Sequence, residues 1–269
     1  FPGIYIAEPC FNEYEKIVKN EGKTVSRFHM DPPFRLSVDD FIRNMPGGVL
    51  TILTNPNNPT GYVLKNDEIE KIYHAVESND GYLLIDETFI DFVDLPNVNP
   101  SFGLSYPRMI KVRAATKSAA LAGVRLGFAG MPHKLKEEFE ARQLPWTVNC
   151  MASEAGQVLE DLDDYFKNTK RYVAEERVRL LEAVNSSAVG KAFKGEANFI
   201  LIELKTISTK YAFNFLLERG ILVRTYSDAV LKDYIRIAVR KIEENNQFID
   251  AWKSLERSAA HVHQATEGN

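Results

Sequence analysis

The chain has 269 residues, of which 45% are hydrophobic, so it can bury one large core or a large and a small one. Its 33 Lys and Arg residues against 37 Asp and Glu residues give a net charge of -4, which provides no attraction for nucleic acid or an anionic membrane and favours a small-molecule ligand. The cysteines, Cys10 and Cys150, lie far apart without metal-ligand spacing, which argues against a disulfide framework or a zinc site and fits a cytoplasmic protein.

The first residues, FPGIYIAEPCFNEY, show a strand pattern without a basic leader. No stretch reaches the roughly 20 apolar residues of a membrane span, so we expect no transmembrane helix. Because the sequence begins on a strand with no preceding cap or linker, we expect that an N-terminal portion of the protein is missing from it.

Four short runs rich in β-forming residues alternate with stretches of helical periodicity. These runs are Ile4–Ala7, Val49–Leu53, Tyr82–Ile85 and Met109–Val112. After Asn66, apolar residues recur at helical spacing until Asn79-Asp80-Gly81 ends the pattern. This alternation predicts an α/β domain with a mostly parallel sheet.

The second half of the chain has a different order of elements. From Ala152 to Val184 the pattern is helical and rich in charge, which is typical of a connector between domains. Strand, helix, strand and helix then follow at Asn198–Glu203, Lys210–Glu218, Tyr234–Val239 and Asn245–Leu255. We therefore predict a large domain over residues 1–170, a smaller α+β domain over 171–258 and a flexible tail over 259–269.

Polar residues follow three predicted strands, where open α/β sheets bind their ligands. The first strand leads into NPNNPTG, a rigid turn that could hold an Asn amide or be an ordinary loop. The second leads to Asp86, which needs a cationic partner and could equally form a structural salt bridge. After the third, Lys117 lies among small residues, where poor hydration would lower its pKa and free it to form a Schiff base. A surface lysine is the alternative.

The ordered series NPNNPTG, LLIDETFIDF and ATKSAALAGVRLGF resembles the signature motifs of class I/II aminotransferases that depend on pyridoxal 5′-phosphate (PLP). The resemblance covers essentially the whole chain. It implies PLP as cofactor and the fold type I transferase architecture, with a mostly parallel large domain and a smaller C-terminal α+β domain. It also implies a homodimer.

The resemblance assigns roles to four residues of the large domain. Lys117 corresponds to the lysine that binds PLP covalently and later moves protons. Asp86 corresponds to the acid that bonds the pyridine nitrogen, and Asn58 to the asparagine that bonds the phenolic oxygen beside the substrate. Phe11 lies where an aromatic ring stacks on the pyridine. Asn58 could otherwise be a turn former, and Phe11 a core aromatic.

Further positions correspond to groups that bind anions. Thr116 and Arg125 correspond to residues that bind the cofactor phosphate. Arg236 corresponds to the arginine that holds the substrate carboxylate, and its strand pattern leaves it on the face opposite its apolar neighbours. Arg224 lies where relatives bind phosphorylated substrates, or it is an exposed charge at a strand end.

The sequence departs from the family pattern at three places. Phe89 stands where a tyrosine hydroxyl usually helps Asn58, which removes one hydrogen bond to the cofactor. Ala114 stands where a hydroxyl commonly binds the phosphate. The glycine-rich phosphate loop and the tyrosines of the family's N-terminal region are absent from the sequence. We therefore expect these residues alone to bind PLP weakly.

Within the family, EPCFNEYE, DETFIDF, QLPWTVN and RIAVRKIEEN resemble the threonine-phosphate decarboxylases of cobalamin synthesis. LAGVRLGF is more similar to histidinol-phosphate aminotransferases. Both reactions start from the same adduct, and the bond held perpendicular to the ring is the one that breaks. The resemblance predicts decarboxylation of an O-phospho amino acid. The alternatives are amino transfer, and a related fold that binds without catalysing.

Overall fold

The computed structural model describes residues 1–98 and 106–267, with side chains up to residue 259. The chain divides into two compact units. The large unit comprises residues 1–58 and 62–170, and the small unit comprises residues 59–61 and 171–269. The short segment 59–61 therefore packs with the small unit although its neighbours in sequence belong to the large one.

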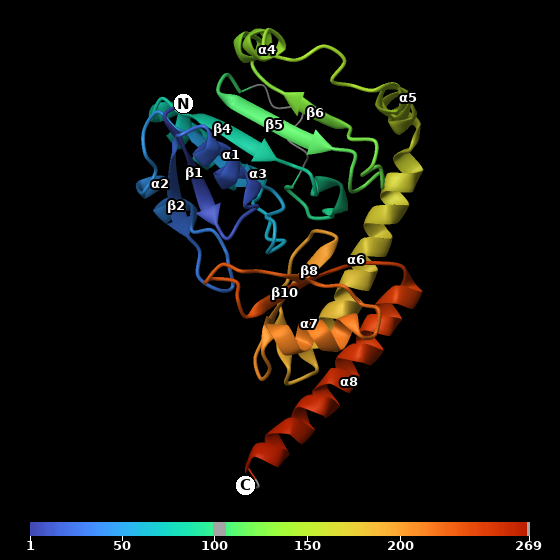
Figure 1. Cartoon of the computed structure of the whole chain (residues 1–269). Helices are drawn as coiled ribbons and strands as arrows, with labels where there is room; N and C mark the ends of the chain where they lie inside the picture. The colour runs from blue at the N-terminus through green and yellow to red at the C-terminus, as the bar shows by residue number, and fades with distance from the viewer. Residues whose placement is uncertain (99–105, 268–269) are drawn as a thin grey trace. The chain divides into compact units, whose positions relative to one another are not determined.

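A six-stranded sheet in the order β2-β1-β3-β4-β5-β6 forms the centre of the large unit. Its strands are β1 (Gly3–Glu8), β2 (Thr24–His29), β3 (Leu50–Thr54), β4 (Tyr82–Asp86), β5 (Met109–Ala114) and β6 (Gly127–Gly130). The first five are parallel, and β6 runs antiparallel to β5, beside which it lies in Figure 1. The predicted mostly parallel sheet is confirmed.

The helices of the large unit are α1 (Glu13–Asn20), α2 (Val38–Arg43), α3 (Asn66–Ser78), η1 (Ile90–Phe92), α4 (His133–Glu140), α5 (Cys150–Val158) and η3 (Leu159–Asp161). In α1, Tyr14 and Val18 pack against the cluster of Ile4, Ile6 and Ile52 on one sheet face. Tyr5, which alternation places on the other face, stacks on Phe41 of α2. The sheet is thus covered by helices on both faces.

Helix α3 confirms the periodicity expected after Asn66. Its apolar residues Ile69, Ile72, Tyr73 and Val76 are all buried. Helix α6 (Asp163–Asn185) is longer than any helix before it in the described part of the chain. It begins in the large unit and continues into the small one. No helix in the described part of the chain is both long and apolar enough to cross a membrane.

The small unit contains an antiparallel sheet in the order β7-β8-β10-β9. Its elements are β7 (Gly190–Ala192), β8 (Phe199–Leu204), α7 (Thr209–Leu217), β9 (Arg224–Thr225), β10 (Tyr234–Ala238) and α8 (Ile242–Glu267). Helix α8 continues as far as Glu267 through the segment predicted to be a flexible tail. Ala, Gln and Glu are good helix formers, and no Gly or Pro interrupts the helix before residue 268.

Segment 59–61 joins the small unit through two glycines. Gly61 has φ +74°, and its carbonyl oxygen accepts a hydrogen bond of 2.8 Å from the amide of Glu196. A β-carbon placed on Gly195 would lie 2.7 Å from Gly61 Cα and 2.8 Å from the carbonyl oxygen of Thr60. The two backbones approach so closely that neither position has room for a side chain.

Candidate active site

The predicted cofactor residues of the large unit follow neighbouring parallel strands. Thr54, the last residue of β3, is paired with Asp86, the last residue of β4. Asp86 is also paired with Val112, two residues before β5 ends at Ala114. Asn58 follows β3, Lys117 follows β5, and Phe11 follows β1, which neighbours β3. Because parallel strands share one carboxyl edge, the fold brings these four residues to the same edge of the sheet.

Thr116 and Arg125 reach this edge from opposite directions. Ala114, the last residue of β5, is paired with Gly127, the first residue of antiparallel β6. Thr116 therefore follows one strand and Arg125 precedes the next at the same end of the pair. Arg125 has φ +62°, is exposed, and donates a hydrogen bond of 3.0 Å to the carbonyl oxygen of Ala122.

Within the chain, neutral donors hold the Asp86 carboxylate. One carboxylate oxygen accepts the Tyr14 hydroxyl. The other accepts the backbone amide of Thr88 at 2.8 Å and its hydroxyl at 2.5 Å. Burial and the neighbouring carboxylate raise the pKa of Tyr14, so its hydroxyl remains protonated. A carboxylate has about four acceptor positions, and these bonds use three, which leaves one for a further donor.

Lys117 has a more open environment than its small neighbours suggested. The side chain is exposed, and its ammonium nitrogen lies 5.9 Å from the centre of the Phe89 ring. The expectation of a poorly hydrated lysine is wrong, because the loop after β5 leaves the Lys117 side chain in contact with water. At the position where the family pattern has a tyrosine, Phe89 provides a ring face near the amine and no hydroxyl.

Asp91 was not recognised in the sequence, although it lies in DETFIDF. It is in η1, and its two carboxylate oxygens bind different elements: one accepts Arg113 of β5, the other the hydroxyl of Ser118 at 2.6 Å. Ser118 is 3% exposed and directly follows Lys117. Asp91 therefore fixes the backbone beside the lysine. Its spacing of 22 and 27 residues from these partners leaves no local sequence signal.

Phe11 exposes an aromatic ring after β1, and Asn58 lies in the turn after β3. Phe11 is 41% exposed, although it is a large apolar side chain. Its ring meets that of Tyr14 edge to face, with centroids 5.7 Å apart. The backbone amide of Asn58 donates a hydrogen bond of 3.4 Å to the hydroxyl of Thr54. This bond fixes the start of the turn after β3. The core position considered for Phe11 is not observed.

In the small unit, Arg224 and Arg236 lie directly opposite each other on β9 and β10. Residues paired in this way point to the same side of the sheet. Arg236 stacks over the ring of Phe199, with its guanidinium carbon 4.7 Å from the ring centre. Burial lowers the pKa of Arg236, and the charge of Arg224 acts in the same direction. Like charges placed opposite each other are unfavourable, so this strand pair is suited to an anion.

Comparisons with known proteins identify the family. The family model described as aminotransferase class I and II matches residues 2–251. The chain belongs to this family. A histidinol-phosphate aminotransferase of Clostridium kluyveri is 31% identical over 92% of this chain and 69% of its own length. A protein of Caldanaerobacter subterraneus, named provisionally as a threonine-phosphate decarboxylase, is 33% identical over 93% of this chain and 70% of its own.

A solved structure, the histidinol-phosphate aminotransferase of Clostridium acetobutylicum, has the same fold. It superimposes with a TM-score of 0.89 at 26% identity and covers 96% of this chain and 79% of its own. This similarity and the family match confirm fold type I. They also make pyridoxal 5′-phosphate the cofactor of the chain.

The groups at the carboxyl edge of the sheet fit this cofactor. The acceptor position left on Asp86 suits a protonated pyridine nitrogen, which has one hydrogen to donate. Phe11 offers an exposed ring face, and Lys117 an exposed amine. Arg125 and Thr116 provide a guanidinium group and a hydroxyl, both suited to a phosphate. We propose these residues as the cofactor site, together with Asn58.

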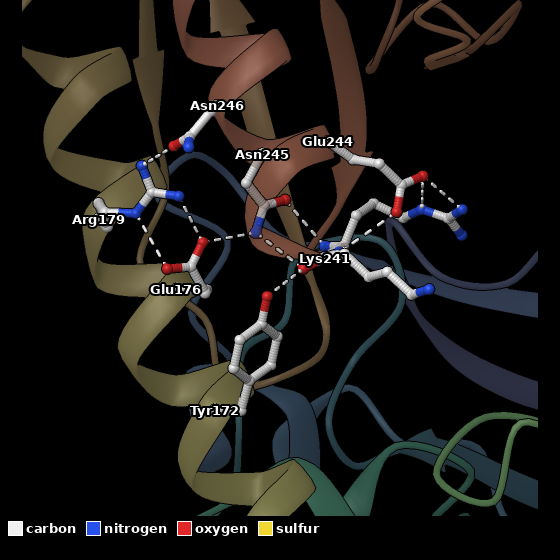
Figure 2. Close-up of polar contacts among 8 residues, drawn as sticks. Tyr172, Glu176, Arg179, Lys241, Glu244, Asn245 and Asn246 are labelled. Carbon is white, nitrogen blue, oxygen red and sulfur yellow. Dashed lines mark hydrogen bonds and ion pairs between the residues drawn. The ribbon is translucent and has the colours of Figure 1, made fainter.

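A polar network joins α6 to the chain between β10 and α8 (Figure 2). Asn245, which is 2% exposed, donates to the carbonyl oxygen of Arg240 at 2.8 Å and accepts from its amide at 2.9 Å. It also donates to Glu176 of α6 at 2.7 Å. Tyr172 donates to the same carbonyl oxygen at 3.0 Å. The network fixes the chain just after β10 and thereby the strand that carries Arg236.

Replacing Glu176 by glutamine should make the stability of the small unit less dependent on pH. The Arg179 guanidinium holds the pKa of Glu176 below its usual range, with help from Asn245 and against the effect of burial. A lowered carboxyl pKa stabilises the fold above the unfolded pKa, and this contribution is lost as the pH falls through the folded pKa. We expect Glu176→Gln to cost about 1–3 kcal/mol at pH 7 and progressively less toward about pH 3.

Urea unfolding at several pH values between these limits measures this difference. Glu182→Gln is the control, because Glu182 lies exposed on the same helix and should change stability by less than about 0.5 kcal/mol. A difference between wild type and Glu176→Gln that stays constant with pH would contradict the role assigned to this carboxylate.

Proposed function

We propose that the chain catalyses the PLP-dependent decarboxylation of an O-phospho amino acid. The observation that supports this most directly is the opposed pair of Arg224 and Arg236. An O-phospho amino acid carries a phosphate and a carboxylate in one small molecule, and two guanidinium groups on one sheet face suit both anions at once. The relative named as a threonine-phosphate decarboxylase is consistent with such a substrate.

In this proposal each residue has a defined role. Arg236 holds the carboxylate and Arg224 the phosphate. When bound, PLP supplies an electron-accepting ring that takes up the electron pair of the bond broken as carbon dioxide leaves. Asp86 keeps the proton on the pyridine nitrogen, and Lys117 delivers a proton to the carbon that has lost its carboxylate. The products are carbon dioxide and a phosphorylated amino alcohol.

Amino transfer with histidinol phosphate is the second candidate. It is supported by the aminotransferase relative at 31% identity and by the aminotransferase-like segment LAGVRLGF. In that reaction Arg224 would hold the phosphate of histidinol phosphate, and Arg236 a carboxylate of the amino acceptor. Lys117 would then remove the proton from the substrate carbon in place of carbon dioxide loss.

We also propose that the chain associates with a second copy. The segment between α4 and α5, together with α5 itself, exposes large apolar side chains: Leu144 is 77% exposed, Trp146 94% and Met151 69%. Exposed apolar groups of this size gathered in one segment are typical of an interaction surface. A homodimer, as implied by the family resemblance, agrees with this segment.

Product analysis distinguishes the two reactions. We expect the PLP-loaded protein to form carbon dioxide and one equivalent of a phosphorylated amino alcohol from O-phospho-L-threonine, without an amino acceptor. Formation of an oxo product from histidinol phosphate only when 2-oxoglutarate is present would instead support amino transfer. Lys117→Ala is the control in both assays. Absence of both products from a protein that binds PLP would contradict the enzyme proposal.

A further inference from the structure

Tyr226 lies two residues after Arg224, just past the end of β9. Its ring centre is 6.0 Å from the guanidinium carbon of Arg224. The hydroxyl is buried, and it has no hydrogen-bond partner within the described part of the chain. A buried hydroxyl without a partner is unfavourable, so its position needs an explanation.

The hydroxyl is close enough to both arginines to feel their charges. Burial raises the pKa of Tyr226 to about 12, while Arg236 and Arg224 act in the opposite direction. The hydroxyl therefore keeps its proton at neutral pH and can act as a donor. Three donors, two of them cationic, therefore lie on or next to the strand pair of β9 and β10.

The neighbours of Tyr226 distinguish between the two anions of the substrate. Alternate residues of an extended chain point to the same side, which places Tyr226 beside Arg224. The ring contact between these two side chains agrees with this placement. Arg236, in contrast, stacks on Phe199 of β8, on the other side of β10 from β9. The charges of both arginines reach the hydroxyl, and the ring contact with Arg224 favours the anion held by Arg224 as its acceptor.

We propose that the Tyr226 hydroxyl donates a hydrogen bond to the substrate phosphate and, with Arg224, determines the preference for phosphorylated over unphosphorylated amino acids. The inference rests on the proposed function, because it assigns Arg224 to the phosphate. A phosphate monoester has three terminal oxygens and can accept both the arginine fork and a hydroxyl. An unphosphorylated side chain would gain no hydrogen bond from this hydroxyl, so it would bind more weakly than its phosphorylated counterpart.

Tyr226→Phe tests this assignment because it removes the hydroxyl and keeps the ring packed against Arg224. Isothermal titration of the PLP-loaded protein with O-phospho-L-threonine and with L-threonine measures the preference. Titration of the PLP-loaded protein with inorganic phosphate, in which the cofactor phosphate occupies the groups at Thr116 and Arg125, measures the anion site at Arg224 alone. We expect about tenfold weaker binding of O-phospho-L-threonine and of phosphate, the effect of one lost hydrogen bond, and no change for L-threonine.

Tyr211→Phe is the matched control. Its hydroxyl pairs with Ser258 at 2.8 Å within the same unit, between helices α7 and α8. The control should bind all three ligands like wild type. An equal loss of affinity for L-threonine in Tyr226→Phe would place the hydroxyl at the carboxylate and overturn the inference. Wild-type affinity of Tyr226→Phe for O-phospho-L-threonine would also overturn it, with the proposed function unaffected.

The proposed function fails in a different way. A wild-type protein that binds PLP but not O-phospho-L-threonine would refute the proposed substrate class. The phosphate titration would then still test Tyr226. Loss of phosphate affinity in Tyr226→Phe but not in Tyr211→Phe would support the hydroxyl as a phosphate ligand, and equal affinities would refute it.

Discussion

Replacing Lys117 by alanine should abolish turnover while leaving the fold unchanged. The substitution removes the amine that binds PLP and transfers protons, which we expect to lower the rate by at least about 10⁴-fold. The side chain is exposed and contacts only the face of the Phe89 ring at 5.9 Å among the interactions described, so the free energy of unfolding should change little. The absorbance band of lysine-bound PLP should disappear with activity.

Borohydride reduction followed by peptide mass spectrometry tests the site directly. In wild type the reduced PLP adduct should lie on the peptide that contains Lys117. Lys136→Ala is the control, because this lysine is exposed on α4 in an ion pair with Glu140 and should leave spectrum and turnover unchanged. An adduct on a different lysine, or a normal PLP band in Lys117→Ala, would show that the motif resemblance assigned the wrong residue.

Replacing Asp86 by asparagine should separate cofactor binding from catalysis. The amide has the size of the carboxylate and can keep the bond from the Thr88 amide, so Lys117 should still capture PLP. It lacks the negative charge that keeps the pyridine nitrogen protonated. We expect the turnover number to fall roughly 10²–10³-fold, the range found when one electrostatic contact to developing charge is removed.

Spectroscopic titration with PLP and steady-state kinetics together measure this separation. Asp39→Asn is the matched control, since this carboxylate is 70% exposed in an ion pair with Lys71. It should leave both PLP affinity and turnover unchanged. A turnover number for Asp86→Asn equal to that of wild type would remove Asp86 from the cofactor site.

The central strands could be predicted from the sequence, whereas the edge strands could not. Strands β1, β3, β4 and β5 are buried between layers and therefore read as short apolar runs. β2 has mostly exposed or half-buried residues, and β6 is the sequence Gly-Phe-Ala-Gly, which carries no β-branched residue. Both strands lie at the edges of the sheet and pair with one neighbour only. They are defined by that pairing, and their apolar content is too low to predict them from the sequence.

The same distinction holds for the candidate site. Lys117, Asp86 and Asn58 could be proposed from the sequence because each lies at or just after the end of a strand in a recognisable motif. Tyr14 and Asp91 could not, because their partners are distant in sequence: 72 residues separate Tyr14 from Asp86. The exposure of Lys117 was also beyond the sequence, since small neighbours make a segment compact without determining which side faces solvent.

The close approach of Gly61 and Gly195 makes the small unit discontinuous along the chain. A polypeptide that starts at residue 171 would lack the carbonyl oxygen that accepts the Glu196 amide, and it would expose the backbone around Gly195 to water. Asn58 is joined by a single peptide bond to the segment that packs there. The turn that carries Asn58 is therefore covalently continuous with backbone that packs inside the small unit, so the sequence of the small unit cannot be cut out of the chain as one uninterrupted piece.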